Sequence, residues 1–488
     1  MLPMTTRCSR RDLLKAILGA RALGLIPFGC SGDTQAPAAT AVRGKLLFVV
    51  AATGGASIVD SFLPVAKSEG KGGSGYDPAQ LVKPSGSNLR CVVPLDNRFI
   101  ALKMGNGYAQ ATFLEKYMAD LAVVTADGTS VNHLVAGKKA LTGDGINRGR
   151  TLGEACALEY GAELLLPNVN MAGQGYIEPG SDDIPNWARA EPVSDPRLFA
   201  FATHGTRGVR GAPDSSLVTR ARTIRSQLED VSRFTQTFSG SRLLQGYRER
   251  RDLIVPRLEE MELISQLLLY QKWEVPLEEF GLNPSPKLQQ ILTTFPRMAV
   301  DPFEAQAALA FLLTRFGVSC SVTIGMSMAP NFEGTERIIN AQAGFDWSHV
   351  DHRGTQNAMW SRVLKVVDAL IGLLKTEDHL GDPTLGKMWD RSLVYIATEF
   401  GRDKVAESGS GHHPNNGAAF ISPLMNGNRV YGGVDPNTSL TYGFDPVTGA
   451  PDPRLRMNEG HIYSAAANAL GIAFPGRIDM PALVRSAG

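Results

Sequence analysis

Five short runs of apolar and β-branched residues divide this sequence, and each run is continuous rather than alternating. They are residues 45–55, 121–128, 318–326, 392–402 and 417–422. A strand with one face in water alternates apolar and polar side chains, whereas a continuous apolar strand is buried on both faces. The five runs therefore predict strands in the interior of a sheet whose two faces are both covered.

Helix-like stretches lie between these runs, most clearly at residues 111–120, 301–316 and 355–377. Strands that alternate with helices are typical of an α/β fold with a mainly parallel sheet. We therefore expect a three-layer fold with helices on both faces of the sheet. In such sheets the functional residues lie in loops at the carboxyl ends of the strands, and each apolar run is followed by a Gly-rich or polar loop.

Residues 213–275 differ in composition from the rest, because they are rich in Arg, Glu, Gln and Leu. Their apolar side chains recur at helical spacing, at Leu217, Ile224, Leu228, Val231 and Phe234. Pro256 should break or kink the second half. We expect a helical insertion packed beside the sheet, or a solvated amphipathic hairpin. Acidic residues balance its arginines, which argues against nucleic-acid binding.

Length and charge exclude several classes of protein. A chain of 488 residues allows one large domain or two to three smaller ones, and we predict one domain over residues 45–485. With 49 Lys and Arg against 48 Asp and Glu, the chain is neither a whole-chain nucleic-acid binder nor an acidic disordered protein. Five cysteines are too few for a disulfide scaffold. Of these, Cys91, Cys156 and Cys320 are expected to be buried thiols.

The charge is unevenly distributed, with a net +3 in residues 1–41 and −2 in the remainder. Within this basic leader SRRDLLK (9–15) resembles the twin-arginine export signal of bacteria, S-R-R-x-F-L-K. The apolar run 16–28 contains Arg21 and is too short to span a membrane. The resemblance implies export by the twin-arginine translocase to the periplasm or cell envelope. The alternative is a basic amphipathic helix of a cytosolic protein.

A lipid anchor is a further expectation from the leader. Gly29-Cys30-Ser31 resembles a lipoprotein cleavage site, although Pro27-Phe28 departs from the usual residues before it. We predict a signal over residues 1–30 and a flexible linker over 31–44. Membrane contact would then come only through a lipid on Cys30, and cleavage without lipidation is the alternative.

Three polar segments carry five of the eight histidines. The first holds Asp346, His349, Asp351 and His352 within seven residues. If a helix begins here, Asp346, His349 and His352 stand three apart and share one face. A mixed set of carboxylate and imidazole groups suits zinc, manganese or iron. A hydrogen-bonded structural cluster is the alternative.

The second segment follows the strand expected at 392–402. Glu399 lies at the end of that strand, and His412 and His413 return after a Gly/Ser loop that could fold over the same point. Glu399 and Arg402 are candidate site residues, although a strand-end ion pair would also explain them.

The third segment follows the strand expected at 121–128 and contains Thr129, Ser130, Asn132 and His133. A hydroxyl at a strand end that enters a helix is where a nucleophile could meet a metal and backbone N–H donors. A helix N-cap explains Thr or Ser equally well. His133 could orient a substrate or could be a buried hydrogen-bonded histidine.

The order of these motifs resembles a bacterial secreted family called domain of unknown function 1501, related to the alkaline phosphatase and sulfatase superfamily. The motifs are GG (54–55), LEKYMADLAVVTADGTSVNH (114–133), FDWSH (345–349), LVYIATEFGR (393–402), GHH (411–413) and VYGG (430–433). The resemblance covers about residues 45–485 and implies an alkaline-phosphatase-like fold. The activity of that family is not established, so the resemblance implies a fold more firmly than a reaction.

In the wider superfamily two metals flank a Ser or Thr nucleophile. The resemblance implies that one metal is held by Asp346, by His349 or His352, and by His412 or His413. TSVNH also looks like the T-x-P-N-H of phosphodiesterase relatives. This implies Thr129 as nucleophile, with Ser130 as second candidate and Asn132 as a substrate contact.

Two departures from the superfamily pattern concern the other metal. Glu399-Phe400 stands where Asp-His is expected, and Phe cannot bind a metal. Ser57 stands where an Asp is expected, with Asp60 as a substitute three residues on. One metal, two or none therefore stay open. Zinc is the first expectation for the divalent metal, with manganese, calcium or iron as alternatives.

Two functions follow from these expectations. The first is an exported metal-dependent hydrolase of phosphate or sulfate esters, in which Arg402 or Lys138 neutralises a small anionic substrate. The second is a surface-anchored protein that keeps the fold and binds an anionic glycan or peptide without turnover. A weaker third reading, assembly with another exported protein, rests on residues 213–275 alone.

Overall fold

The computed structural model describes residues 44–98, 108–177, 179–203, 209–326, 344–404 and 408–485. The predicted signal (1–30), its Cys30 and nearly all of the predicted linker (31–44) lie outside the described residues. None of the helices in these ranges combines the length and apolarity that a membrane span requires.

The core of the fold is an eight-stranded sheet with the order β12-β4-β11-β8-β1-β7-β5-β6. Its strands are β1 (Leu46–Ala52), β4 (Leu121–Asp127), β5 (Asn168–Asn170), β6 (Glu191–Pro192), β7 (Ser321–Gly325), β8 (Ser392–Thr398), β11 (Asn415–Ile421) and β12 (Arg429–Tyr431). Only β11 is antiparallel to its neighbours β4 and β8, and every other pair is parallel. The predicted α/β fold with a mainly parallel sheet is confirmed.

Four of the five apolar runs contain a strand, namely β1, β4, β7 and β8, and the fifth overlaps β11, which begins two residues earlier at Asn415. Every residue of β1, β7, β8 and β11 is buried. This burial on both faces is what the absence of alternation predicted.

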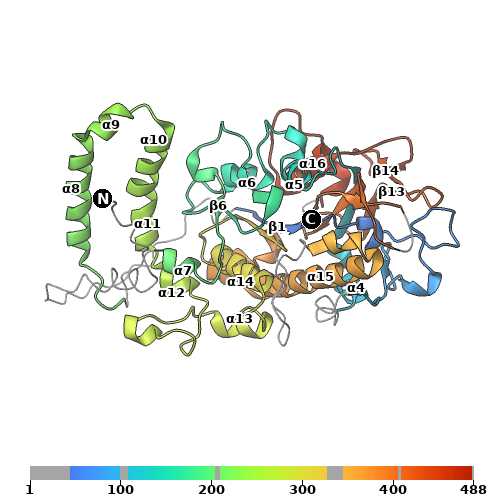
Figure 1. The fold of residues 1–488 in the computed structure, drawn as a ribbon, viewed down its shortest axis with the longest axis horizontal. Helices are drawn as coiled ribbons and strands as arrows, with labels where there is room; N and C mark the ends of the chain where they lie inside the picture. The colour runs from blue at the N-terminus through green and yellow to red at the C-terminus, as the bar shows by residue number, and fades with distance from the viewer. Residues whose placement is uncertain are drawn as a thin grey trace, which may run out of the picture. The chain divides into compact units, whose positions relative to one another are not determined.

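Helices cover both faces of the sheet (Figure 1). One layer contains α5 (His133–Thr142), α6 (Leu152–Tyr160) and α16 (Glu459–Leu470), which contact one another. The other contains α4 (Gln110–Tyr117), α13 (Leu288–Thr294), α14 (Pro302–Arg315) and α15 (His352–Thr376). The helices α4, α14 and α15 correspond to the three helix-like stretches of the sequence, although α4 begins one residue and α15 three residues before the stretch expected. Since α14 is buried from Phe303 to Thr314, it is apolar around most of its circumference.

The direction of the strands gathers distant parts of the chain at one edge of the sheet. Because β1, β4 and β8 are parallel, the residues that follow them emerge at the same edge. The reversed strand β11 begins there, since Asn415 pairs with Asp127 at the end of β4. Just before it, β10 (His412–His413) pairs with β9 (Gly401–Arg402). The polar segments that follow β4 and β8 therefore meet at this carboxyl edge.

Several short strands lie outside the eight-stranded sheet. They form a pair of β2 (Leu81–Val82) with β3 (Cys91–Val92), and a small sheet of β13 (Gly433–Val434), β14 (Thr441–Phe444) and β15 (Pro451–Asp452). Cys91, Cys156 and Cys320 are buried free thiols, as expected.

Residues 198–286 form a separate compact unit. Its helices are α7 (Phe199–Ala202), α8 (Ser215–Asp230), α9 (Arg233–Thr237), α10 (Arg242–Glu249), α11 (Val255–Glu260) and α12 (Leu263–Leu267). A π-helical turn over Arg250–Ile254 comes just before Pro256. This distortion has a local cause, because proline has no N–H and its ring clashes with the preceding turn.

Candidate metal centre

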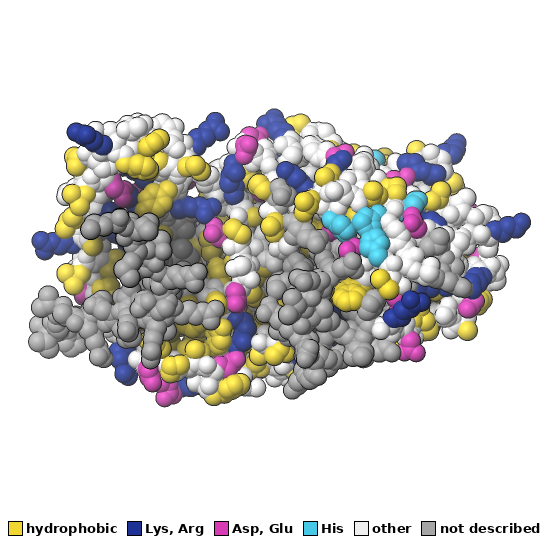
Figure 2. Space-filling model, in the orientation of Figure 1, with side chains coloured by type: hydrophobic (Ala, Val, Ile, Leu, Met, Phe, Trp, Pro, Cys, Tyr) yellow, Lys and Arg dark blue, Asp and Glu magenta, His cyan; other side chains and the backbone are white. Residues whose placement is uncertain are grey.

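Four side chains from three distant segments meet at the carboxyl edge of the sheet. His133 is the first residue of α5, immediately after the loop that follows β4. Asp346 and His349 lie on a 3-10 helix, Gly344–His349, and His412 lies on β10. Figure 2 shows histidine side chains grouped on the surface in view. The tertiary fold thus forms a histidine and carboxylate cluster.

The spacing of the ligand atoms fits one metal ion. One atom each from His133, Asp346 and His412 lies within 4.8 Å of the others. Asp346 Oδ1 is 3.3 Å from His133 Nε2 and 3.8 Å from His412 Nε2. Bonds of about 2.1 Å to a tetrahedral zinc place neighbouring ligand atoms about 3.4 Å apart. This group could therefore hold a metal ion.

His349 extends the cluster toward solvent. Its Nε2 is 3.2 Å from Asp346 Oδ1 and 2.9 Å from His412 Nε2. Two ring nitrogens at this distance either share one proton or direct both lone pairs at a common cation. The His349 side chain is 36% exposed, so it is the outward member of the group.

The hydrogen bonds behind the cluster fix the tautomers of two histidines. The Nδ1 of His412 is 2.9 Å from the carbonyl oxygen of Val131, which can only accept, so Nδ1 carries the proton. The Nδ1 of His133 is 2.6 Å from Glu399 Oε2. When His133 and His412 are neutral and carry their proton on Nδ1, the lone pair on the Nε2 of each ring faces Asp346. Metal-binding histidines are oriented by outer hydrogen bonds of this kind.

The electrostatics of the cluster also suit a cation. Hydrogen bonds to Asp346 and Glu399 raise the pKa of His133 to about 9, against the effect of burial. Burial favours a raised pKa for Asp346, but the hydrogen bond from His133 and nearby positive charges outweigh it and lower that pKa. Burial lowers the pKa of His412. A positive charge is therefore stabilised beside Asp346, which a proton on His133 or a metal ion can supply.

Arg402 holds the surrounding loops together rather than facing solvent. Its side chain is fully buried, and the guanidinium donates to the carbonyl oxygens of Gly54, Gly55, Phe345 and Ser410. It also lies 3.5 Å from Asp346 Oδ1 and 3.4 Å from His349 Nε2. These donors are used within the protein, so the geometry gives Arg402 a positioning role and not contact with an external anion.

Phe400 packs against the cluster. Its ring stacks on His412 with centroids 4.1 Å apart, and its centroid is 4.9 Å from that of His133. Phe400 therefore supports two candidate ligands without being a ligand itself.

His352 does not join Asp346 on a shared face. The 3-10 helix ends at His349 and α15 begins only at His352, with Asp351 as its N-cap, so no single helix carries the three residues. His352 is 98% buried, and its Nε2 lies 3.1 Å from Asp60 Oδ2. The other Asp60 oxygen accepts from the Tyr76 hydroxyl at 2.7 Å. Asp60 and His352 thus form a separate buried pair.

The predicted nucleophile segment has other partners. Thr129 donates its N–H (2.7 Å) and its hydroxyl (3.0 Å) to Glu459 Oε1, and Lys139 Nζ donates to Thr129 Oγ1 at 2.6 Å. Ser130 Oγ accepts from the Asn132 N–H, and Asn132 is the N-cap of α5. The residue that caps α5 is therefore Asn132, and not Thr129 or Ser130, which the N-cap interpretation of the sequence named.

His413 also lies apart from the ligand group. Adjacent residues of a strand point to opposite faces, and His413 Nδ1 accepts from the Asn415 N–H at 3.2 Å. From the sequence, His133 is expected to orient a substrate or to be a buried hydrogen-bonded histidine, and not to be a metal ligand. The sequence did contain a signal for His133, namely its position. It is the residue after the N-cap Asn132, in the polar segment that follows the buried strand β4.

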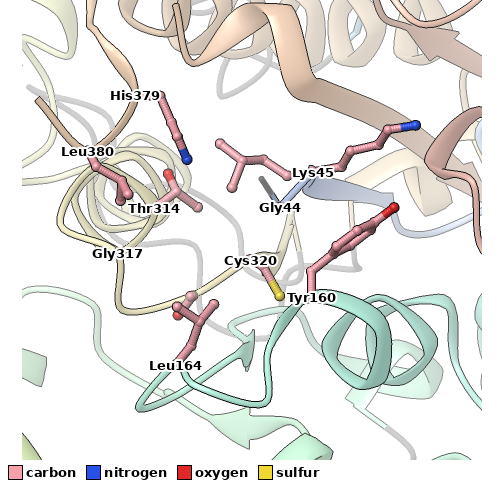
Figure 3. Close-up of a pocket in the computed structure, with 11 residues that line it drawn as sticks. Gly44, Lys45, Tyr160, Leu164, Thr314, Gly317, Cys320, His379 and Leu380 are labelled. Atoms are coloured by element: carbon pink, nitrogen blue, oxygen red, sulfur yellow. The ribbon is translucent and has the colours of Figure 1, made fainter. Parts of the chain in front are cut away.

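A small cavity at the opposite edge of the sheet carries no comparable chemistry. It has a volume of about 10 Å³ and is lined by residues that include Lys45, Tyr160 and Cys320 (Figure 3). Lys45 and Cys320 directly precede β1 and β7, which places this cavity at the amino edge. Its lining is mostly apolar.

Comparisons with protein-family models and with curated proteins find no match to this chain.

Proposed function

We propose that His133, Asp346 and His412 bind a divalent metal, with zinc the first expectation, and that the protein hydrolyses small phosphate or sulfate esters. One observation carries the proposal. Ligand atoms of three residues converge within 4.8 Å at the carboxyl edge of an α/β sheet. The motif order, which resembles the alkaline phosphatase and sulfatase superfamily, supports the reaction class.

Export is part of this proposal. The SRRDLLK segment supports transport by the twin-arginine translocase, and Cys30 is the residue that a lipid anchor would use. The working compartment is then the periplasm or the cell envelope, where esters from the surroundings are available as substrates.

A bound metal would supply Lewis-acid polarisation of the ester and a lowered pKa for a water molecule. The protein's own groups hold the geometry: Glu399 and the Val131 carbonyl accept from the Nδ1 atoms of His133 and His412. His349 is partly exposed and lies within hydrogen-bond distance of Asp346 Oδ1. His349 therefore lies between the cluster and solvent.

Metal analysis of variants tests the proposal directly. In Asp346→Asn and His412→Ala, bound zinc and any turnover of aryl phosphates or aryl sulfates should fall at least tenfold. His413→Ala is the matched control, because it removes the neighbouring imidazole but leaves the cluster intact. Wild-type zinc content in both cluster variants would refute the metal centre.

A non-catalytic binding protein is the second candidate, and the position of Thr129 favours it. The Thr129 hydroxyl is engaged with Glu459 and Lys139, and Arg402 is committed to carbonyl groups. In this case the metal centre would capture an anionic glycan without cleaving it. Multiple turnover that Thr129→Ala abolishes would count decisively against this candidate.

A further inference from the structure

A second cavity lies directly behind the metal centre, among the ends of the central strands and the start of α16. It has a volume of about 20 Å³, and its lining includes Tyr395, Thr398, Glu399, Asn416 and Glu459. A space of this size holds one water molecule or one ion.

Glu399 presents an unpartnered oxygen in this region. Its side chain has no exposed surface. Oε2 is used, because it faces His133 Nδ1 at 2.6 Å and accepts from the Gly54 N–H at 3.2 Å. Oε1 is buried and has no hydrogen-bond partner among the described residues.

Glu459 shows the same asymmetry. The residue is 94% buried, and its Oε1 accepts both the N–H and the hydroxyl of Thr129. Oε2 is buried without a hydrogen-bond partner, and no Lys, Arg or His of the described chain lies within ion-pair distance of this carboxylate. Two nearly fully buried glutamates that line one cavity therefore each keep one unsatisfied oxygen.

A buried carboxylate oxygen without a partner is costly, and buried charges are normally paired or bound to a metal. One shared cation would satisfy both oxygens, while a single proton neutralises only one carboxylate. The polar groups around the cavity offer oxygen donors, which Mg²⁺, Ca²⁺ and Mn²⁺ prefer, and imidazole or thiolate donors are absent from its lining.

We propose that the cavity between Glu399 and Glu459 is a second cation site, which takes a hard divalent ion through the two free carboxylate oxygens. This inference goes beyond the proposed function and does not depend on ester hydrolysis. Glu399 joins the two sites, since its other oxygen faces His133.

Manganese alone, added to protein already loaded with zinc, is a suitable probe. Wild-type protein should bind one equivalent of Mn²⁺ in addition to zinc, and Glu459→Gln should bind that equivalent at least tenfold more weakly. Glu154→Gln is the matched control. Glu154 is also buried, but both of its oxygens accept backbone N–H groups, from Thr151 and Gly180. This variant should bind Mn²⁺ like the wild type.

Anomalous scattering at the manganese edge decides the position of the ion in wild-type crystals, even if Glu459→Gln fails to fold. Density between Glu399 and Glu459 is the expected result. A cavity without manganese density, or equal Mn²⁺ binding by wild type and Glu459→Gln, would overturn the inference. Failure of the metal centre is separately visible, because His412→Ala should lose zinc and keep the manganese equivalent.

Discussion

At the scale of single residues, Gly55 allows the loop after β1 to pass close to the residues that support the candidate metal centre. Its φ of +80° lies in the region that favours glycine. A Cβ atom at this position would be 2.5 Å from a ring carbon of Phe400 and 3.0 Å from Arg402 Nε. Since Phe400 packs on His412 and Arg402 ties the loops together, a side chain here would disturb the support of the cluster.

Gly55→Ala should therefore cost both stability and metal affinity. We expect about 1–2 kcal/mol of backbone strain, plus about 1–3 kcal/mol for the clash. Gly145→Ala is the control, because Gly145 has a φ of +87° and no atom lies within 4 Å of its added Cβ. Urea unfolding and zinc titration measure the two effects. Equal losses in both variants would show that the contact with Phe400 and Arg402 is unimportant.

At the scale of elements, one carboxylate joins three helices of the same layer. Glu377 caps the end of α15 and accepts from Lys287 at 2.7 Å, from Gln290 of α13 at 3.0 Å and from Arg315 of α14 at 2.9 Å. A negative charge at a helix C-terminus is unfavourable by itself. These partners compensate, so Glu377 stabilises the packing of the layer.

Glu377→Gln should lower stability in a pH-dependent way. Burial acts to raise the pKa of Glu377, but hydrogen bonds from Lys287, Arg315 and Gln290 outweigh it and lower this pKa from 4.5 to about 2. A lowered pKa stabilises the fold above about pH 4.5, and this stabilisation disappears as the pH falls toward 2. After screening by solvent we expect a deficit of about 1–2 kcal/mol at pH 7.

Urea unfolding at pH 7, 5, 4 and 3 measures this deficit. The difference between wild type and Glu377→Gln should shrink steadily as the pH falls. Glu115→Gln, on the exposed side of α4, serves as the control and should show no such trend. A difference that stays constant between pH 7 and pH 3 would contradict the role assigned to the carboxylate.

At the scale of the whole molecule, the candidate metal centre consists of residues from segments that only the complete sheet brings together. His133, Asp346 and His412 are separated by 213 and 66 positions in the sequence. An unfolded chain does not hold them at ligand distance, so metal binding should favour the folded state alone.

Zinc at 100 times its Kd should then raise the free energy of unfolding by about 2.7 kcal/mol, and a chelator should reverse the gain. Asp346→Asn should lose this response. Asp182→Asn, which removes a carboxylate whose side chain is 97% exposed, should keep it. Thermal or urea unfolding with and without zinc provides the measurement, and a wild-type stability that does not respond to zinc would contradict the coupling.

Local patterns predicted much of the fold, because a strand that is buried on both faces has a continuous apolar sequence of its own. The continuous run LLFVVAA, for example, became the central strand β1 without reference to the rest of the chain. No local pattern predicted the strand order or the antiparallel direction of β11, because pairing between distant strands depends on the whole sheet. For this reason local patterns predicted the layers, whereas the grouping of Asp346 with His412 was an expectation from the family resemblance, and His133 as a third member of the group came only from the tertiary structure.

The sequence by itself determined the α/β class, the buried strands and the short list of polar segments, since each depends on composition and spacing within about ten residues. Only the tertiary structure decided membership of the site. In the structure His352 contacts Asp60, and Arg402 donates to four backbone carbonyl groups. His133 lies with Asp346 and His412. The physical reason is that a metal centre is defined by distances between ligand atoms, and those distances follow from strand directions at the sheet edge rather than from neighbours in the chain.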